Sequence, residues 1–190
     1  KATGDVPLRS LKELRLLSFN LFNFDRRMGE NLYGERSAAE IEELARNVRD
    51  HLPDLAFFQE IQGGIESLGA FNREDLSGLY LPFLTPGNDS RGIDLGALAH
   101  QDLGFQYEYI SFRDSILHDP NLGPEIVKTF NRDAPVLLIR ARGANPAGPP
   151  FLVVMNIHMK SKRDMDGDRE SFKLRRAQFE LAVRIYQYFK

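Results

Sequence analysis

Apolar residues gather in short runs along the chain, and each run predicts a β-strand. Leu14–Phe22 is nearly continuously apolar, which is the pattern of a strand that is covered on both faces. A second buried strand is predicted at Leu55–Phe58, and it ends in Gln59-Glu60. Further strands are predicted at Ile93–Ala99, Gln106–Ser111, Pro135–Arg140 and Phe151–Ile157, with residues 143–150 as the surface turn of a hairpin between the last two.

Two segments have helical periodicity instead. Ser37 and Glu40 have the spacing of a capping box, which predicts that a helix begins there and that Pro53 stops it. Its predicted apolar face consists of Ile41, Leu44, Ala45, Val48 and Leu52.

The second predicted helix covers residues 168–190 and has two apolar stripes, so it requires neighbours on more than one side. The stripes are Phe172, Phe179, Ala182 and Tyr186, and Leu174, Leu181, Ile185 and Tyr188. We expect the chain by itself to leave apolar surface exposed on this helix, including Leu181, Ile185 and Tyr188. Residues 63–90 contain several Gly and Pro residues and are expected to be irregular.

Strands that occur singly and in pairs, with helices between them, predict a layered α/β domain. The 190 residues fit one domain, which we expect to cover residues 14–190 after a polar lead-in at 1–13. With 42% apolar residues the chain can bury a sizeable core, and this composition excludes a disordered protein.

Composition limits the possible chemistry. The formal net charge of −2 excludes a polycation that holds nucleic acid by bulk attraction, so any phosphate affinity must come from local cations or a metal. The absence of cysteine excludes disulfides, thiolate metal sites and a cysteine nucleophile. No apolar run reaches the length of about 18 residues that a membrane-spanning helix needs.

Polar residues interrupt the apolar strands near their ends. They are Asn20, Glu60, Asp94, Asn156 and His158. Each has an ordinary structural explanation: a hydrogen-bonded core amide, a carboxylate where a strand reaches the surface or caps a turn, or a satisfied structural histidine. Burying an ionisable group is unfavourable unless it is paired or binds a metal, so five such residues together predict one polar pocket at the rim of a sheet.

Phosphodiester hydrolysis would give these residues a common purpose. It requires a divalent cation on the phosphate, for which one carboxylate with amides and waters is a usual Mg²⁺ arrangement. It also requires a cationic clamp and an oriented imidazole. Glu60, Arg132 and a His158–Asp94 pair could fill these three roles, although Arg132 and the Lys160, Lys162 and Arg163 cluster could equally be solvated surface charges.

Five motifs, in this order, resemble signatures of the endonuclease/exonuclease/phosphatase superfamily. They are LSFNLFN, DLAFFQEI, SRGIDLGAL, FNRDAPV and FLVVMNIHMKSK, and they run from about Leu14 towards the helix that ends at Lys190. The last motif is most similar to bacterial nuclease-type members. The resemblance implies a four-layer α/β sandwich of the DNase-like type, with two mixed sheets flanked by helices.

The resemblance also implies roles for individual residues. Glu60 would bind Mg²⁺ or Mn²⁺ with Asn20 nearby, and His158 would be catalytic, oriented by Asp94. Arg132, Asn156, Lys160 and Lys162 would lie on the phosphate side. The implied activity is metal-dependent hydrolysis of a nucleic acid, and the alternatives are a phosphatase or sphingomyelinase-like phospholipase, or a binding module without catalysis.

Two further family motifs, GDFN and a C-terminal Ser-Asp-His, do not occur in these 190 residues. We therefore expect an incomplete N-terminal portion of the fold that is inactive alone, completed by the rest of the same protein or by a partner chain. The nuclease-like motif and the start without Met favour an exported bacterial protein. The motifs leave open whether the substrate is DNA or RNA, whether cleavage is endo or exo, and the oligomeric state.

Overall fold

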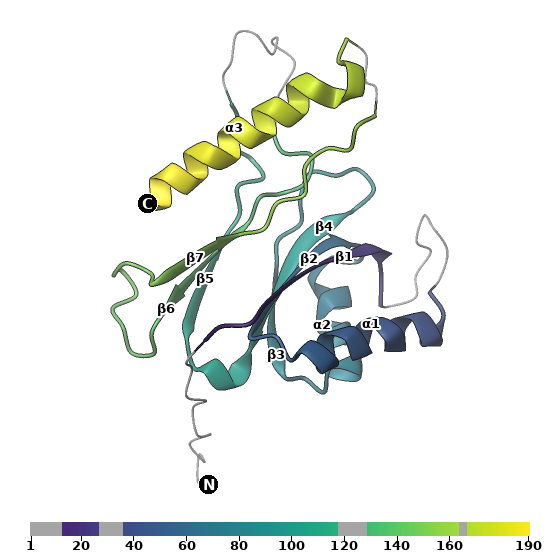
Figure 1. Cartoon of the computed structure of the whole chain (residues 1–190), viewed down its shortest axis with the longest axis vertical. Helices are drawn as coiled ribbons and strands as arrows, with labels where there is room; N and C mark the ends of the chain where they lie inside the picture. The colour runs from purple at the N-terminus through teal and green to yellow at the C-terminus, as the bar shows by residue number, and fades with distance from the viewer. Residues whose placement is uncertain (1–12, 27–35, 118–128, 164–166) are drawn as a thin grey trace, which may run out of the picture.

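The computed structural model describes residues 13–26, 36–117, 129–163 and 167–190. Their elements form two β-sheets with helices on the outer faces (Figure 1). The four-stranded sheet has the order β1-β2-β4-β3 and consists of β1 (Leu16–Phe24), β2 (Leu55–Ile61), β3 (Tyr80–Leu84) and β4 (Asp94–His100). The three-stranded sheet has the order β5-β6-β7 and consists of β5 (Gln106–Ile110), β6 (Val136–Arg140) and β7 (Leu152–Met155).

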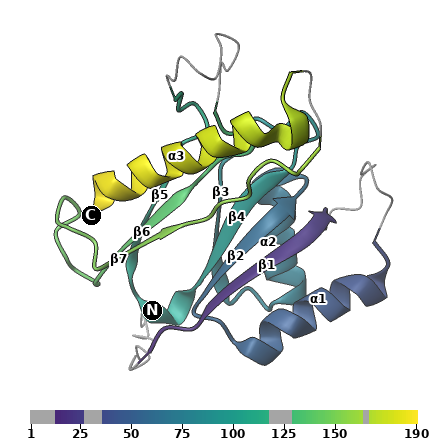
Figure 2. The same ribbon diagram turned by 45° about the horizontal axis from the view of Figure 1, so that its top comes forward.

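Three helices complete the layers: α1 (Ala38–His51), α2 (Gly64–Asp75) and α3 (Phe172–Phe189). Helices α1 and α2 cover one face of the four-stranded sheet, whereas α3 crosses the outer face of β5-β6-β7 (Figure 2). Two short 3₁₀ turns complete the elements: η1 (Gln101–Leu103) lies between β4 and β5 in the chain, and η2 (Arg169–Ser171) directly precedes α3. No helix in the described ranges is long and apolar enough to cross a membrane.

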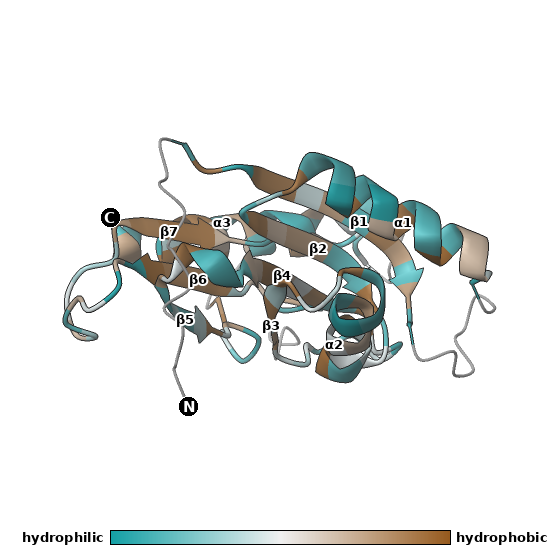
Figure 3. Ribbon diagram, turned by 90° about the horizontal axis from the view of Figure 1, so that it is seen from below, coloured by the Kyte–Doolittle hydropathy of each residue, from teal (hydrophilic) through white to brown (hydrophobic). Residues whose placement is uncertain are grey.

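Alternation along the strands builds three hydrophobic interfaces. In β2, Ala56 and Phe58 pack towards α1 and α2, whereas Leu55 and Phe57 point into the space between the sheets. In β6, Leu137 and Ile139 face that same inter-sheet core, while Val136 and Leu138 pack against α3. The apolar strands β2, β4 and β6 are largely brown in Figure 3, whereas much of α1 is teal. The structure therefore has the four layers that were predicted.

Several sequence predictions about single elements are confirmed. Ser37 and Glu40 make both hydrogen bonds of the capping box, and α1 ends where Leu52 adopts a left-handed conformation. Strands lie at the predicted positions, and β6 and β7 pair as an antiparallel hairpin. The predicted lead-in falls almost wholly outside the described residues.

Four predictions need correction. Residues 63–90 contain α2 and β3, because Gly63 and Gly64 provide the positive φ angles at which α2 starts, and the Asn72 side chain then bonds both backbone groups of Tyr80. Strand β1 is an edge strand and not covered on both faces, since Leu16 is 55% exposed. Leu52 lies outside the apolar face of α1, at its exposed cap.

The fourth correction concerns α3. Leu181 and Ile185 are buried against β5-β6-β7 instead of exposed, and of the three residues predicted to be exposed only Tyr188 is. The exposed apolar residues of α3 are Phe172, Phe179, Val183, Tyr186 and Tyr188. The helix therefore has one covered stripe within the described chain and one uncovered stripe.

Candidate active site

Two adjacent strands are distorted at the same level, and each distortion turns a polar side chain into one cavity. In β2 the register against β4 shifts between Gln59 and Ile61, which makes Glu60 the extra residue of a β-bulge with φ of 61°. Bulges are typical next to active sites, where they re-aim a side chain. Strand β1 shifts register over the same interval, and Phe22 and Asn23 have φ of 52° and 57°. Glu60 and Asn23 thus leave the regular sheet side by side.

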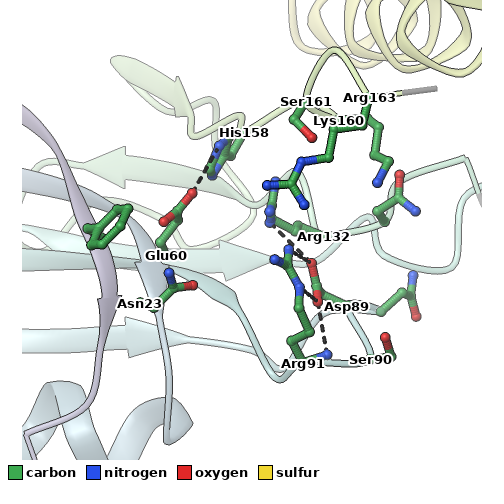
Figure 4. Close-up of a pocket in the computed structure, with 13 residues that line it drawn as sticks. Asn23, Glu60, Asp89, Ser90, Arg91, Arg132, His158, Lys160, Ser161 and Arg163 are labelled. Atoms are coloured by element: carbon green, nitrogen blue, oxygen red, sulfur yellow. Dashed lines mark hydrogen bonds and ion pairs between the residues drawn. The ribbon is translucent and has the colours of Figure 1, made fainter. Parts of the chain in front are cut away.

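The opposite wall is built by loops at the ends of β4, β6 and β7. Asp89 and Arg91 precede β4, Arg132 precedes β6, and His158 follows β7. Figure 4 shows Glu60 and Asn23 across from the Asp89, Arg91 and Arg132 group, with His158 and Lys160 above them. The cavity has a volume of about 520 Å³ and is lined by Phe22, Asn23, Glu60, Asn88, Asp89, Ser90, Arg91, Asn131, Arg132, His158, Lys160, Ser161 and Arg163.

Positive charge dominates this lining. Four permanent cations, Arg91, Arg132, Lys160 and Arg163, face two carboxylates. One of these carboxylates, Asp89, is already paired, with Oδ2 at 2.9 Å from Arg91 Nη2 and 3.4 Å from Arg132 Nε. Burial would raise the Asp89 pKa, but the hydrogen bonds from Arg91 and the charges of both arginines hold that pKa below its ordinary value. A cavity with this excess of cations favours an anionic ligand.

His158 faces Glu60, with Nε2 at 3.6 Å from Oε1. Burial is the largest influence on the His158 pKa and lowers it, and the positive charge of Arg132 lowers it further. The Glu60 carboxylate acts in the opposite direction without reversing the shift. His158 is therefore neutral at pH 7, and it can donate one hydrogen bond and accept another.

A buried glutamine on α3 fastens two loops of the cavity. Gln178 is 1% exposed, and its Oε1 accepts a 2.8 Å hydrogen bond from Lys160 N. Its Nε2 donates to Thr129 O and to Asn131 Oδ1. The loop after β7 and the loop before β6 are thus held by the same side chain, so α3 fixes these two loops of the opposite wall relative to one another.

The residues present fit a magnesium-type cation, although the set is small. In the described part of the chain no group of three or more His, Asp or Glu residues could hold a metal. Asn23 Oδ1, however, is buried without a hydrogen-bond partner among the described residues. Phe24 pairs with Ile61 across β1 and β2, and Asn23 and Glu60 are the residues directly before these two. Mg²⁺ commonly keeps several waters and takes one or two protein oxygens plus substrate phosphate, which matches this carboxylate and amide.

Four of the predicted site residues meet in the cavity: Glu60, Arg132, His158 and Lys160. Glu60 was expected just after a strand and lies in a bulge within one. Lys162, by contrast, is exposed and does not line the cavity. Only the lysine nearer to β7 therefore belongs to the cationic wall.

Asn20 does not line the cavity. It is exposed, and its Oδ1 accepts a 2.8 Å hydrogen bond from Phe22 N. This hydrogen bond stabilises the left-handed turn at Phe22 and Asn23. Asn23, and not Asn20, is therefore the asparagine of β1 that lines the cavity next to Glu60. The register shift in β1, which the sequence pattern does not reveal, causes the exchange.

Asp94 does not contact His158. Its Oδ1 accepts a 2.7 Å hydrogen bond from Gly87 N, while His158 Nδ1 has no hydrogen-bond partner among the described residues. Gly87 packs directly on the loop that carries Arg132, since an added Cβ would lie 3.0 Å from Asp133 N. Asp94 consequently supports the arginine wall and not the imidazole.

Asn156 has a structural role instead of the predicted contact with phosphate. Its Nδ2 donates to Phe58 O at 3.0 Å and to Gly96 O at 3.2 Å, and its Oδ1 accepts from Gln59 Nε2 at 2.9 Å. Both amide protons are used, so Asn156 has none left for a ligand. It joins the end of β7 to both central strands of the other sheet.

The sequence pattern did not reveal Asn23, Asp89 and Arg91, and it singled out Arg163 only as part of a cluster that could be solvated surface charges. A signal existed for two of them, since Asp89 and Arg91 belong to the polar segment NDSRG directly before the motif strand that contains Asp94. Asn23 could not be chosen over Asn20 without the register of β1. Nothing in the sequence distinguishes Arg163 from an ordinary surface arginine.

No protein-family model and no curated protein matches this chain. A functionally unknown conserved protein from Enterococcus faecalis V583 is similar in structure, with 16% sequence identity and a TM-score of 0.44 over 77% of this chain and 53% of that one. An endonuclease/exonuclease/phosphatase from Bacteroides vulgatus has 11% identity and a TM-score of 0.42 over 67% of this chain and 47% of that one. The chain thus spans about half the length of these two structures. Similarity at this level assigns neither a superfamily nor an activity to this chain.

Proposed function

We propose that the protein hydrolyses phosphodiester bonds with the help of Mg²⁺ or Mn²⁺ and that its substrate is a nucleic acid. One observation supports this proposal most: the Glu60 carboxylate, an imidazole 3.6 Å from it, and an amide oxygen without a partner among the described residues line one cavity with four cations. The order of the five sequence motifs is independent support, because the resemblance implies site roles for Glu60, Arg132 and His158, and these three residues line one cavity.

Each wall has a distinct task in this proposal. Glu60 and Asn23 would hold the divalent cation, which when bound neutralises phosphate charge and activates water. Arg132 and Arg91, oriented by Asp89, would donate hydrogen bonds to the non-bridging oxygens, whose charge grows in the transition state. His158, neutral at pH 7, would donate a hydrogen bond to the phosphoryl group or exchange a proton with it at Nε2.

The test is a substrate panel with the intact protein. We expect Mg²⁺-dependent cleavage of single-stranded DNA, plasmid DNA or RNA that EDTA abolishes and that Glu60→Gln abolishes as well. Glu43→Gln is the matched control, because Glu43 is an exposed carboxylate on α1 away from the cavity. Turnover of sphingomyelin or inositol phosphates instead would replace nucleic acid by the phospholipase or phosphatase alternative. Binding of these phosphates without any turnover would show a non-catalytic module.

A further inference from the structure

Phe22 is an exposed aromatic ring at the mouth of the cationic cavity. Its side chain is 67% exposed, yet it belongs to the cavity lining together with Glu60 and Arg132. Single exposed apolar residues are common and need no explanation alone. The other highly exposed aromatic side chains of the described chain, which are Phe151, Phe172, Phe179, Tyr186 and Tyr188, do not line this cavity.

The backbone at Phe22 is held in an unfavourable conformation. Its φ of 52° lies in the left-handed region, which is unusual for a bulky residue and persists only where neighbouring groups enforce it. Asn20 Oδ1 accepts from Phe22 N at 2.8 Å. Arg36 Nη2 donates to Phe22 O at 2.9 Å and to Leu21 O at 2.6 Å. Three hydrogen bonds with two side chains therefore hold the backbone from which the ring projects.

An exposed aromatic face on a held backbone, beside cations that can bind phosphate, is an arrangement that binds single-stranded nucleic acid. Cations follow the backbone, and aromatic side chains stack on bases that are not stacked on one another. A base within a duplex presents no free face, whereas an unpaired base does. A phospholipid or an inositol phosphate has no planar group that would stack on the ring.

We propose that Phe22 is a stacking platform for an unpaired nucleobase, which makes the cavity selective for single-stranded nucleic acid. The inference rests on the proposed function, because it takes the cations of the cavity to be a phosphate-binding wall. Asn20 and Arg36 act as positioning residues for the ring. This gives Asn20 a role in substrate selection in place of the metal site in which it was expected.

Binding without turnover tests the platform separately from catalysis. We would measure the affinity of the intact protein, in EDTA, for a thymidine hexanucleotide, for a hexamer of abasic tetrahydrofuran nucleotides and for a blunt duplex. The abasic hexamer has the same phosphates but no bases. Phe22→Ala should weaken binding of the thymidine oligomer about tenfold and leave binding of the abasic oligomer within about twofold. The wild type should bind the duplex more weakly than the single strand.

Two further variants keep the test sharp. These 190 residues contain no tryptophan, so Phe22→Trp retains an aromatic face and adds a tryptophan fluorophore at this position. Its emission should be quenched by the thymidine oligomer and not by the abasic one. Phe179→Ala is the matched control, because Phe179 is a 59% exposed phenylalanine on α3 outside the cavity, and it should leave both affinities unchanged.

The possible results distinguish the two proposals. If Phe22→Ala weakened both oligomers equally, or neither, the stacking role would be overturned even if the protein cleaved DNA. If binding depended on bases and on Phe22 while no phosphodiester was cleaved, the platform would stand and the hydrolase proposal would fail. If Phe22→Ala were misfolded, the quenching of Phe22→Trp would decide, since unquenched emission with bound oligomer contradicts stacking.

Discussion

Two groups of polar side chains near the end of β7 differ in their hydrogen bonding. The satisfied cluster consists of Asn156 and its partner Gln59, and the unsatisfied cluster consists of His158 and Asn23 in the cavity lining. Asn156 directly follows β7, and His158 comes two positions later in the chain. The Asn156 amide has partners for both of its protons and for its oxygen. His158 Nδ1 and Asn23 Oδ1 are buried without a partner among the described residues.

The difference separates a structural polar residue from a functional one. A buried polar group that stays unsatisfied destabilises the fold by about 1–3 kcal/mol, so such groups need an explanation, and a ligand is one. Asn156 joins β7 to β2 and β4 and so fixes the strand end from which His158 extends. The satisfied cluster thus joins the two sheets, whereas the unsatisfied one is open to a ligand, and variants of the two should fail in different ways.

The largest effect is expected at Glu60. Glu60→Gln keeps the shape of the side chain and removes the charge that would hold the cation, so turnover should fall by roughly a thousandfold or more. The thermal midpoint of the apo protein should change by no more than about 2 °C, because the ion pair of Glu60 with His158 is long, with 3.6 Å between Oε1 and Nε2. Steady-state hydrolysis and circular dichroism melting measure the two. Near-normal turnover would remove Glu60 from the site.

A second large effect is expected at Arg132. Arg132→Lys preserves one positive charge but loses the planar guanidinium that can contact a phosphate with two N–H groups. We expect kcat/KM to fall roughly a hundredfold. Lys160→Ala should act mainly on KM and by a smaller factor, since a lysine binds phosphate as a point charge. Equal effects of the two variants would indicate that the wall acts only by its total charge.

Asn156 should show the reverse pattern. Asn156→Leu has a similar volume and removes three hydrogen bonds, so the free energy of unfolding should fall by about 2–3 kcal/mol. The folded fraction should retain most of its turnover at low temperature, since the Asn156 amide does not reach the cavity lining. Denaturant unfolding and activity per folded molecule measure these quantities. Loss of activity with unchanged stability would contradict the structural role.

Hydrophobic patterning predicted the layers and most strands, because alternation and capping are local signals. The capping box at Ser37 and the strand at Leu55 are examples. Patterning failed at residues 63–90, where glycines that usually mark a loop start a helix, and where Asn72 replaces a backbone pairing by side-chain bonds. It also failed to show which side of α3 is covered, since both stripes are apolar and only tertiary packing chooses between them.

The site was partly predictable for a similar reason. Glu60, Arg132 and His158 lie in motifs, and their chemistry is legible without a structure. Asn20 and Asn23 are chemically identical, and a register shift decided between them. Asp94 and Asn156 were buried polar residues in the right strands, but a sequence does not reveal whether such a group is satisfied by Gly87 N or by Phe58 O.

The smallest effect we expect is a pH dependence of stability from His158. Burial and Arg132 lower the folded-state pKa of His158 below the unfolded value of about 6.5, against the opposing charges of Glu60 and Asp89. Between these two pKa values the unfolded chain binds more protons, so stability falls as the pH drops through this window and is constant in this respect above it.

Guanidinium unfolding in EDTA from pH 8 to 5 should therefore show that the wild type loses stability relative to His158→Gln below about pH 6.5. Glu60→Gln should strengthen that loss, because it removes a charge that favours the imidazolium. A wild type that gains relative stability on acidification would show instead that the Glu60–His158 ion pair outweighs burial, and His158 would then be a charged partner of Glu60 instead of a neutral donor to phosphate.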